Sequence, residues 1–156
     1  YMNSQLIKME AITNGFSEGI ALDVNGYVGE GSGENLFLVH DNIIYTPGIH
    51  NGILSGITRK TIMTIAKEMG YQIVEGNLMR EMLYMADEMF FSGTAAEITP
   101  IRSVDKMNVG NGMPGKVTKQ LQEAFFDIVK NGNDKYGWLT YVDGNEKILN
   151  MQKISS

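Results

Sequence analysis

The stretch GYVGEGSGENLF, residues 26–37, combines four glycines with two carboxylates, Glu30 and Glu34. The Asn25-Gly26 pair at its start is a strong hairpin signal, because both residue types accept a positive φ. The strand-like run EGIALDV (18–24) precedes that turn, and the apolar run NLFLV (35–39) follows the glycines. The stretch therefore lies inside a meander of short strands, where its glycines let the backbone approach a ligand.

The pattern continues outward from this meander in both directions. His40-Asp41-Asn42 predicts a second turn into a strand at 43–47. Apolar residues at helical intervals predict a mixture of helices among further strands, so the sheet should be mixed rather than purely parallel. We expect helices at 2–13, 59–69 (capped by Thr58), 78–83 and 115–130, and strands at 71–76, 88–91 and 98–104.

Composition excludes several classes of function. The 156 residues carry a net charge of −5 and their basic residues are scattered, whereas binding to a nucleic-acid backbone needs a basic face. No apolar run approaches the roughly 18 residues that a membrane span requires. The absence of cysteine excludes disulfides and thiolate sites and fits a cytoplasmic protein. We therefore expect neither nucleic acid nor membrane as a partner.

Familiar catalytic and binding motifs are also missing. His40 and His50 are the two histidines, HExxH does not occur, and no serine sits in a GxSxG elbow between a strand and a helix, so a His-rich metal site or a Ser-His-Asp hydrolase has little support. The glycines at 29, 31 and 33 differ in spacing from the dinucleotide motif GxGxxG and precede a strand instead of a helix. Glu30 would moreover repel a pyrophosphate.

Two other segments suit a phosphate better. SGIT (55–58) directly precedes a predicted helix, whose first N–H groups are free to bind an anion. SGTAAE (92–97) follows a predicted strand and offers a glycine and a threonine hydroxyl. Together with the glutamate-bearing glycine segment at 26–37, these segments indicate a ligand that is anionic at one end and cationic further along. Pyridoxal phosphate (PLP) fits this description, because it carries a phosphate at one end and a pyridine nitrogen further along. A carboxylate beside that nitrogen keeps it protonated, and the protonated ring accepts electrons from the substrate.

The motifs EGSGENLF (30–37), LSGITR (54–59) and FFSGTAAEITPIRSVD (90–105) closely resemble those of fold-type IV PLP enzymes, the branched-chain amino acid aminotransferases in particular. The likeness runs from Tyr1 to about Val142. It implies an α/β (α+β) fold, a mixed-sheet pseudo-barrel with flanking helices that forms the large C-terminal domain of such enzymes. Residues 1–142 would be this PLP-binding domain, and 143–156 a tail of uncertain order.

The resemblance also implies roles for single residues around the cofactor ring. Glu30 would hold the pyridine nitrogen, Tyr1 would bond the ring oxygen, and Leu54 would pack on the ring face. Glu34 receives no cofactor contact, and we expect it to have a structural role in its turn.

Phosphate and substrate would bind at the two other motifs. The resemblance implies that Ile57 and Thr58 bind the phosphate through backbone N–H groups and the Thr58 hydroxyl, and that Thr94 adds its own hydroxyl. The backbone at Thr94 and Ala95 would receive the carboxylate of a branched-chain L-amino acid or a 2-oxo acid.

Two parts of the family pattern have no match in this sequence. The lysine that forms the Schiff base would lie a few residues before the position of Tyr1, and none of the ten lysines matches it. A smaller N-terminal domain would also be absent. We therefore expect this sequence to be a piece of a longer, homo-oligomeric enzyme, without a catalytic residue of its own and inactive alone. D-amino acid aminotransferase, aminodeoxychorismate lyase and a non-catalytic PLP-binding module are the alternatives.

Overall fold

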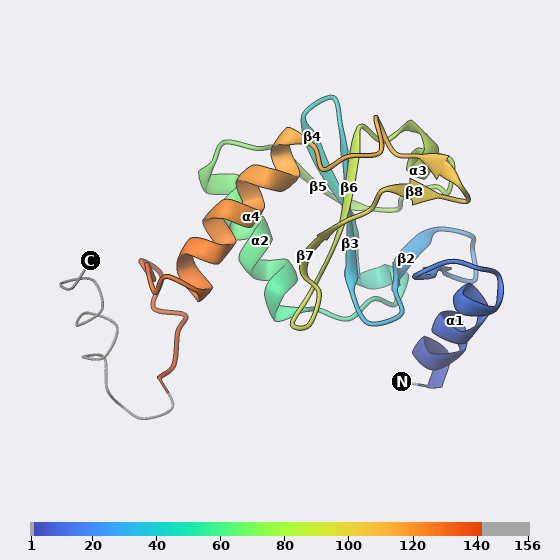
Figure 1. Ribbon diagram of the computed structural model, residues 1–156, viewed down its shortest axis with the longest axis horizontal. Coiled ribbons are helices and arrows are strands. Elements are labelled where there is room, and N and C mark those ends of the chain that lie inside the picture. The colour runs from blue at the N-terminus through green and yellow to red at the C-terminus, as the bar shows by residue number, and fades with distance from the viewer. Residues whose placement is uncertain (1, 142–156) are drawn as a thin grey trace.

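A five-stranded mixed sheet, in the order β5-β4-β3-β6-β7, forms the centre of the computed structural model, which describes residues 2–141 (Figure 1). Its neighbouring strands are antiparallel except for the parallel pair β4 and β5, which the chain joins through a helix. This mixed sheet with flanking helices confirms the predicted α/β class. Its strands are β3 (Asn35–His40), β4 (Ile43–Pro47), β5 (Ile73–Gly76), β6 (Glu88–Gly93) and β7 (Glu97–Pro100).

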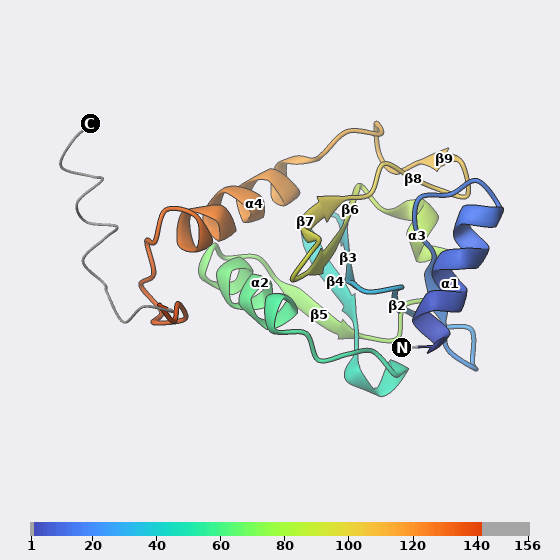
Figure 2. The ribbon, with the colours of Figure 1, turned by 60° about the horizontal axis from the view of Figure 1, so that its bottom comes forward.

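Smaller elements surround this sheet. Two antiparallel hairpins pair β1 (Ile20–Leu22) with β2 (Val28–Gly31), and β8 (Ser103–Val104) with β9 (Met107–Asn108). The helices are α1 (Met2–Thr13), α2 (Ile57–Glu68), α3 (Met82–Met85) and α4 (Lys116–Val129), and a 3-10 turn, η1, spans Ile49–Asn51. Figure 2 shows α2 and α4 side by side over the sheet and α1 at the opposite side of the molecule.

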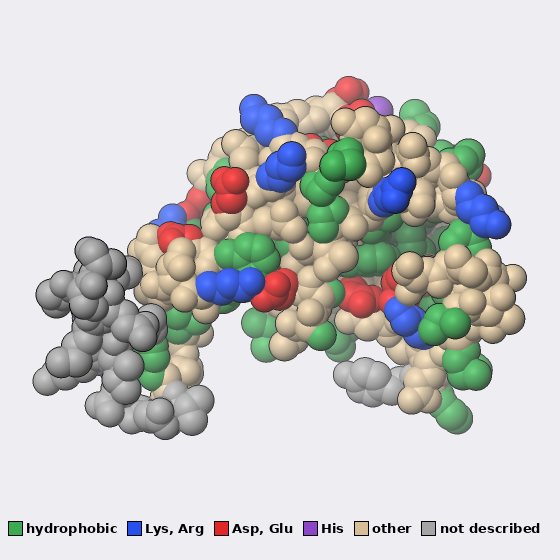
Figure 3. Space-filling model, viewed as in Figure 1, with side chains coloured by type: hydrophobic (Ala, Val, Ile, Leu, Met, Phe, Trp, Pro, Cys, Tyr) green, Lys and Arg blue, Asp and Glu red, His purple; other side chains and the backbone are tan. Residues whose placement is uncertain are grey.

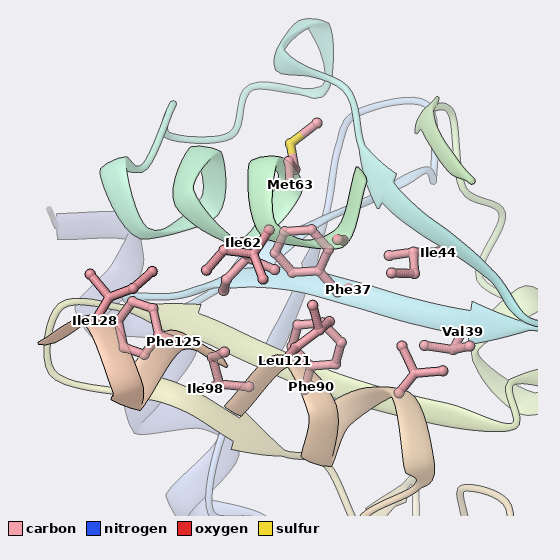
Figure 4. Close-up of a cluster of buried hydrophobic side chains, with 13 residues drawn as sticks. Phe37, Val39, Ile44, Ile62, Met63, Phe90, Ile98, Leu121, Phe125 and Ile128 are labelled. Carbon is pink, nitrogen blue, oxygen red and sulfur yellow. The ribbon is translucent and has the colours of Figure 1, made fainter. Parts of the chain in front are cut away.

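The main hydrophobic core lies between the sheet and the helices α2 and α4 (Figure 4). Phe37 of β3 stacks on Phe90 of β6, with 5.0 Å between ring centroids and an interplanar angle of 11°. Burying a side chain of this kind stabilises the fold by about 1.5–3 kcal/mol. The helices contribute residues at the intervals that predicted them, namely Ile62, Ile65 and Ala66 from α2, and Val117, Leu121, Phe125 and Ile128 from α4.

A second core covers the other face of the sheet. Successive strand residues point to opposite faces, so Leu36 and Leu38 of β3 pack with Met89 and Phe91 of β6 on this side. Since both faces are covered, β3 is an uninterrupted buried run from residue 35 to 39. This explains why NLFLV lacks polar alternation.

A carboxylate from the sheet determines where α4 begins. The Glu88 side chain of β6 accepts hydrogen bonds from the backbone N–H groups of Val117 (3.0 Å) and Thr118 (2.8 Å) and from the Thr118 hydroxyl (2.7 Å). These bonds satisfy N–H groups that a helix start leaves unpaired. A Cβ at Gly115 would collide with the Glu88 carboxyl, so this approach requires glycine there.

Two sequence predictions about helices are wrong. Thr58 does not cap α2, which begins at Ile57 with Gly56 as its N-cap and no side-chain cap. The helix predicted at 78–83 is confined to Met82–Met85. Leu78 and Met79 instead bond to the β1–β2 hairpin. The Leu78 carbonyl accepts the N–H of Val28 at 2.8 Å, and Met79 forms an isolated β-bridge with Tyr27.

The strand predicted at 98–104 is divided in two. Pro100, the last residue of β7, cannot donate a ladder hydrogen bond. The chain then turns away, and Ser103–Val104 pairs with Met107–Asn108 through a turn in which Asp105 and Lys106 have φ of 48° and 68°. The predictions for Tyr1 and for the tail at 143–156 lie outside the described residues.

Candidate functional site

Three loops meet at one end of the five-stranded sheet, the lower end in Figure 1. They are the β2–β3 turn, the loop from β4 to α2, and the β6–β7 turn. Strand register brings two of them together, because Asn35 at the start of β3 pairs with Ser92 near the end of β6. A Cβ at Gly93 would lie 3.3 Å from the Gly33 carbonyl oxygen, so these two turns touch. The three motifs that predicted a ligand site are thus at one place.

Glu30 faces this site from β2 as a half-buried side chain. Its Oε2 accepts the Leu54 N–H at 2.9 Å and the Asn35 amide N–H at 3.2 Å. Within residues 2–141, both hydrogen bonds of this carboxylate fall on the same oxygen, so Oε1 is available to a ligand. Burial raises the pKa of Glu30 above its ordinary value, and the hydrogen bond from Leu54 offsets this only in part. A nearby cation would reverse the shift.

The raised pKa gives Glu30 a predictable effect on stability. Because the folded pKa lies above the ordinary value of 4.5, the folded state keeps its proton longer than the unfolded state as pH rises. Stability is therefore lost as pH rises from 4.5 through the folded pKa. In the ligand-free protein we expect Glu30→Gln to unfold at equal or slightly higher urea concentration at pH 7, by less than about 1 kcal/mol because the group is half exposed. Urea titrations at about pH 7 and about pH 4 should show that this gain disappears in acid; a gain that grows in acid would contradict the assignment.

Leu54 and the start of α2 form the second side of the site. Leu54 lies in the loop beside the Glu30 carboxylate and is 65% exposed, and Ile57 is 84% exposed. The first turn of α2 contains no acidic residue, and its N-cap Gly56 provides no side chain to bond the free N–H groups. Thr58 is half-buried in this first turn, and its hydroxyl makes no hydrogen bond among residues 2–141. An uncapped helix of 12 residues therefore offers N–H groups and a hydroxyl to an anion.

The β6–β7 turn forms the third side. Thr94 and Ala95 are exposed in this turn, directly after the last residue of β6. Ser92, two residues earlier, is fully buried and its hydroxyl oxygen has no hydrogen-bond partner. Antiparallel partners point to the same face, so this hydroxyl lies on the face that also carries Asn35. Most buried polar atoms in proteins are hydrogen-bonded, so this hydroxyl is available to a further partner.

Two residues of the site were not identified from sequence, Asn35 and Arg59. Asn35 is 5% exposed and donates both to Glu30 and to the Leu54 carbonyl, the latter at 2.8 Å. Arg59 is 2% exposed, and its Nη2 donates to the Pro47 carbonyl at 2.9 Å. Both belong to the recognised motifs, as the Asn of EGSGEN and the Arg of SGITR. Their place in these motifs is the sequence feature that could have identified them.

Glu34, assigned a structural role, lies in the β2–β3 turn. Its Oε2 accepts the Gly33 N–H at 3.2 Å. A Cβ at Gly31 would lie 2.8 Å from the same oxygen, so the carboxylate folds back over its own turn. The two acids of GYVGEGSGENLF therefore differ in direction, since Glu30 reaches across to the β4–α2 loop.

Two other features of the surface are separate from this site. An open hollow of about 1150 Å³ lies between α1 and the segment 99–106, and its lining includes none of the predicted site residues. Charged residues also line the hollow, but Arg80 and Asp105 among them are already paired with each other at 2.9 Å. We assign the chemistry to the three loops instead, because polar groups of three motifs converge there. On the face shown in Figure 3, basic and acidic side chains are interspersed, and no basic stripe is present there.

His40, Asp41 and Asp87 form a cluster at the opposite end of β3. Their potential ligand atoms lie within 4.8 Å of one another. Asp87 Oδ2, however, already accepts the Asp41 N–H at 2.9 Å, and Asp41 and Asn42 have φ of 50° and 63°. The cluster thus anchors a left-handed turn between β3 and β4, which matches the predicted position of this turn.

The three sides together fit a phosphorylated pyridine cofactor. A half-buried carboxylate whose hydrogen bonds both fall on one oxygen suits a protonated ring nitrogen, an exposed leucine suits the ring face, and an uncapped helix start with threonine hydroxyls suits a phosphate. No helix within residues 2–141 is long and apolar enough to cross a membrane.

Fold and site define the class of protein. The family model "Amino-transferase class IV" matches residues 1–104, and the chain belongs to this family. Among curated relatives, the branched-chain-amino-acid aminotransferases of Escherichia coli K12 and Pseudomonas aeruginosa are 54% identical over 144 residues and 50% identical over 143. The aligned parts cover 92% and 91% of this chain but 47% and 46% of the relatives, so the chain spans about half their length.

Solved structures agree with these relatives. The Escherichia coli branched-chain amino acid aminotransferase superposes with a TM-score of 0.89 at 53% identity, over 92% of this chain and 48% of that one. The enzyme of the same name from the archaeon Thermoproteus uzoniensis, solved with norvaline, gives a TM-score of 0.85 at 44% identity, over 90% and 46%. A further branched-chain amino acid aminotransferase, complexed with N-(5'-phosphopyridoxyl)-L-glutamate, gives 0.86 at 47% identity, over 90% and 48%. The chain thus has the fold of the branched-chain aminotransferases of this class, as the motifs predicted.

Proposed function

We propose that the complete gene product carrying this chain is a PLP-dependent aminotransferase that moves the amino group of leucine, isoleucine or valine to 2-oxoglutarate. The observation that carries the proposal is Glu30, a half-buried carboxylate with one bonded and one available oxygen beside an exposed Leu54. The identity of the relatives supports the choice of branched-chain substrates.

Each side of the site would have a distinct role toward the cofactor. When bound, the cofactor would supply the electron-accepting ring that amino transfer requires. Glu30 would hold a proton on the ring nitrogen, and Leu54 would cover one ring face and exclude water. Ile57, Thr58 and Thr94 would bind the phosphate, and the backbone at Thr94 and Ala95 would orient the substrate carboxylate.

The activity is proposed for the complete gene product and not for these 156 residues alone. The resemblance implies a Schiff-base lysine that none of the ten lysines here matches, and also a ring-oxygen contact from Tyr1. A cytoplasmic location and assembly into a homo-oligomer are further predictions from the same resemblance.

Substrate choice provides the direct test. We expect the complete gene product, supplied with PLP, to convert L-leucine and 2-oxoglutarate into 4-methyl-2-oxopentanoate and glutamate, at least about 100-fold faster than it consumes D-alanine. A chiral assay of both amino acids measures this ratio. Preference for D-alanine, or conversion of aminodeoxychorismate, would support the related enzymes of the same fold. Cofactor binding without any turnover would support a non-catalytic PLP-binding module.

A further inference from the structure

Asn35 connects the two ends of the candidate site. Its amide nitrogen donates to Glu30 Oε2 at 3.2 Å and to the Leu54 carbonyl at 2.8 Å. An amide NH₂ has two hydrogens, and each of these bonds can use one of them. The side chain is 5% exposed, so neither bond competes freely with water.

Leu54 closes this arrangement into a ring of three hydrogen bonds. Its N–H donates to the same Glu30 oxygen at 2.9 Å, while its carbonyl accepts from Asn35 and, at 2.9 Å, from the Gly56 N–H. A Cβ at Gly56 would collide with Asn35 Oδ1, so the amide lies directly against the N-cap of α2. One asparagine therefore contacts the carboxylate on β2, the loop residue Leu54 and the start of the helix.

We propose that Asn35 is a positioning residue that fixes the Glu30 carboxylate relative to the start of α2 before any ligand arrives. This inference rests on the proposed function, in which these two elements hold opposite ends of one cofactor. A site fixed in advance spends less of its binding energy on ordering its own groups. Asparagine suits this role because aspartate would lose both donors and repel Glu30 at close range.

The test compares Asn35→Ala and the nearly isosteric Asn35→Asp with Thr46→Val in the complete gene product. Thr46 is a matched control, since it is also a buried polar residue and its hydroxyl donates to the Leu36 carbonyl at 2.8 Å, whereas it has no hydrogen bond to Glu30 among residues 2–141. The binding probe is pyridoxamine 5'-phosphate, measured by calorimetry, because its amine cannot form a Schiff base with a lysine. Hydrogen exchange of the Leu54 amide in the ligand-free protein gives a second readout.

We expect both Asn35 variants to weaken binding of the probe by about 10-fold or more, and Thr46→Val by less than about 2-fold. Exchange at Leu54 should accelerate about 10-fold in the Asn35 variants alone. In a Glu30→Gln background, Asn35→Ala should have a clearly smaller effect on binding, because the two residues act as a unit. Equal effects of Asn35→Ala and Thr46→Val, full additivity with Glu30→Gln, or unchanged exchange at Leu54 would each overturn the proposal.

The two proposals can fail separately. If the wild-type protein does not bind pyridoxamine 5'-phosphate, the proposed function fails. The exchange of the Leu54 amide then still decides whether Asn35 holds this loop. If the wild type binds but Asn35→Asp binds equally well, the function stands and the positioning role of Asn35 is wrong.

Discussion

Glu30→Gln should reduce amino transfer from L-leucine by the complete gene product about 100- to 1,000-fold, with little change in the KM for leucine. In the proposed site this carboxylate would face the cofactor ring and stabilise positive charge on its nitrogen, whereas glutamine could not. Loss of one preorganised charge-stabilising group from an active site typically costs about 3–4 kcal/mol of barrier. Single-turnover kinetics with leucine, followed by the cofactor's absorbance, measure the step directly.

The same substitution should leave the fold intact, which separates catalysis from stability. Glutamine keeps an oxygen for the Leu54 N–H, and the charged form of Glu30 is the one that burial disfavours. Glu34→Gln is the matched control, because this carboxylate bonds the Gly33 N–H within its own turn. We expect it to retain more than about half of the wild-type rate. Equal losses in both variants would mean that the segment 30–35 acts as a structural unit and that Glu30 has no special role.

The sequence predicted the periodic parts of the fold well. Helices α1, α2 and α4 and the strands of the meander appeared close to their predicted bounds. Helices α2 and α4 each bury an apolar face with the helical period, whereas the apolar residues that predicted α1, such as Leu6 and Met9, are exposed. The helix at 78–83 failed because Leu78 and Met79 bond to the β1–β2 hairpin. Such a partner is distant in sequence and leaves no periodic signal.

Some residues of the candidate site were likewise indicated by the sequence, and others only by the structure. Glycine spacing and the unusual carboxylates indicated the segment 26–37 from sequence, because a phosphate loop would not contain them. The resemblance then assigned Glu30 the cofactor contact, which stays a prediction. Asn35 was part of the same motif, but its two bonds to Glu30 and Leu54 depend on how β3 and the β4–α2 loop are placed together. A hydrogen-bond network that spans three segments is a property of the tertiary structure.

Arg59→Met should destabilise the protein by about 3 kcal/mol and weaken phosphate binding at the start of α2. The guanidinium is 2% exposed and bonds both the Pro47 carbonyl (2.9 Å) and the Glu75 carboxylate (2.8 Å). Methionine fills much of the volume but leaves a buried carbonyl without a donor, which costs about 1–3 kcal/mol, and also removes a charged hydrogen bond. Glu75 is 44% exposed, so its lost partner adds less than in a fully buried pair.

Arg59 lies next to the predicted phosphate-binding residues, so its substitution should also affect ligand binding. Arg59 follows Thr58 directly and ties the first turn of α2 to the ends of β4 and β5, so its loss should let the predicted phosphate-binding N–H groups move. Lys60→Met is the matched control, since the neighbouring lysine is exposed on the same helix and should change stability by less than about 0.5 kcal/mol. Urea unfolding and calorimetry with inorganic phosphate measure both effects. A stable Arg59→Met protein would mean that the ends of β4 and β5 hold α2 through packing alone, and unchanged phosphate binding in an unstable one would place the anion away from this helix.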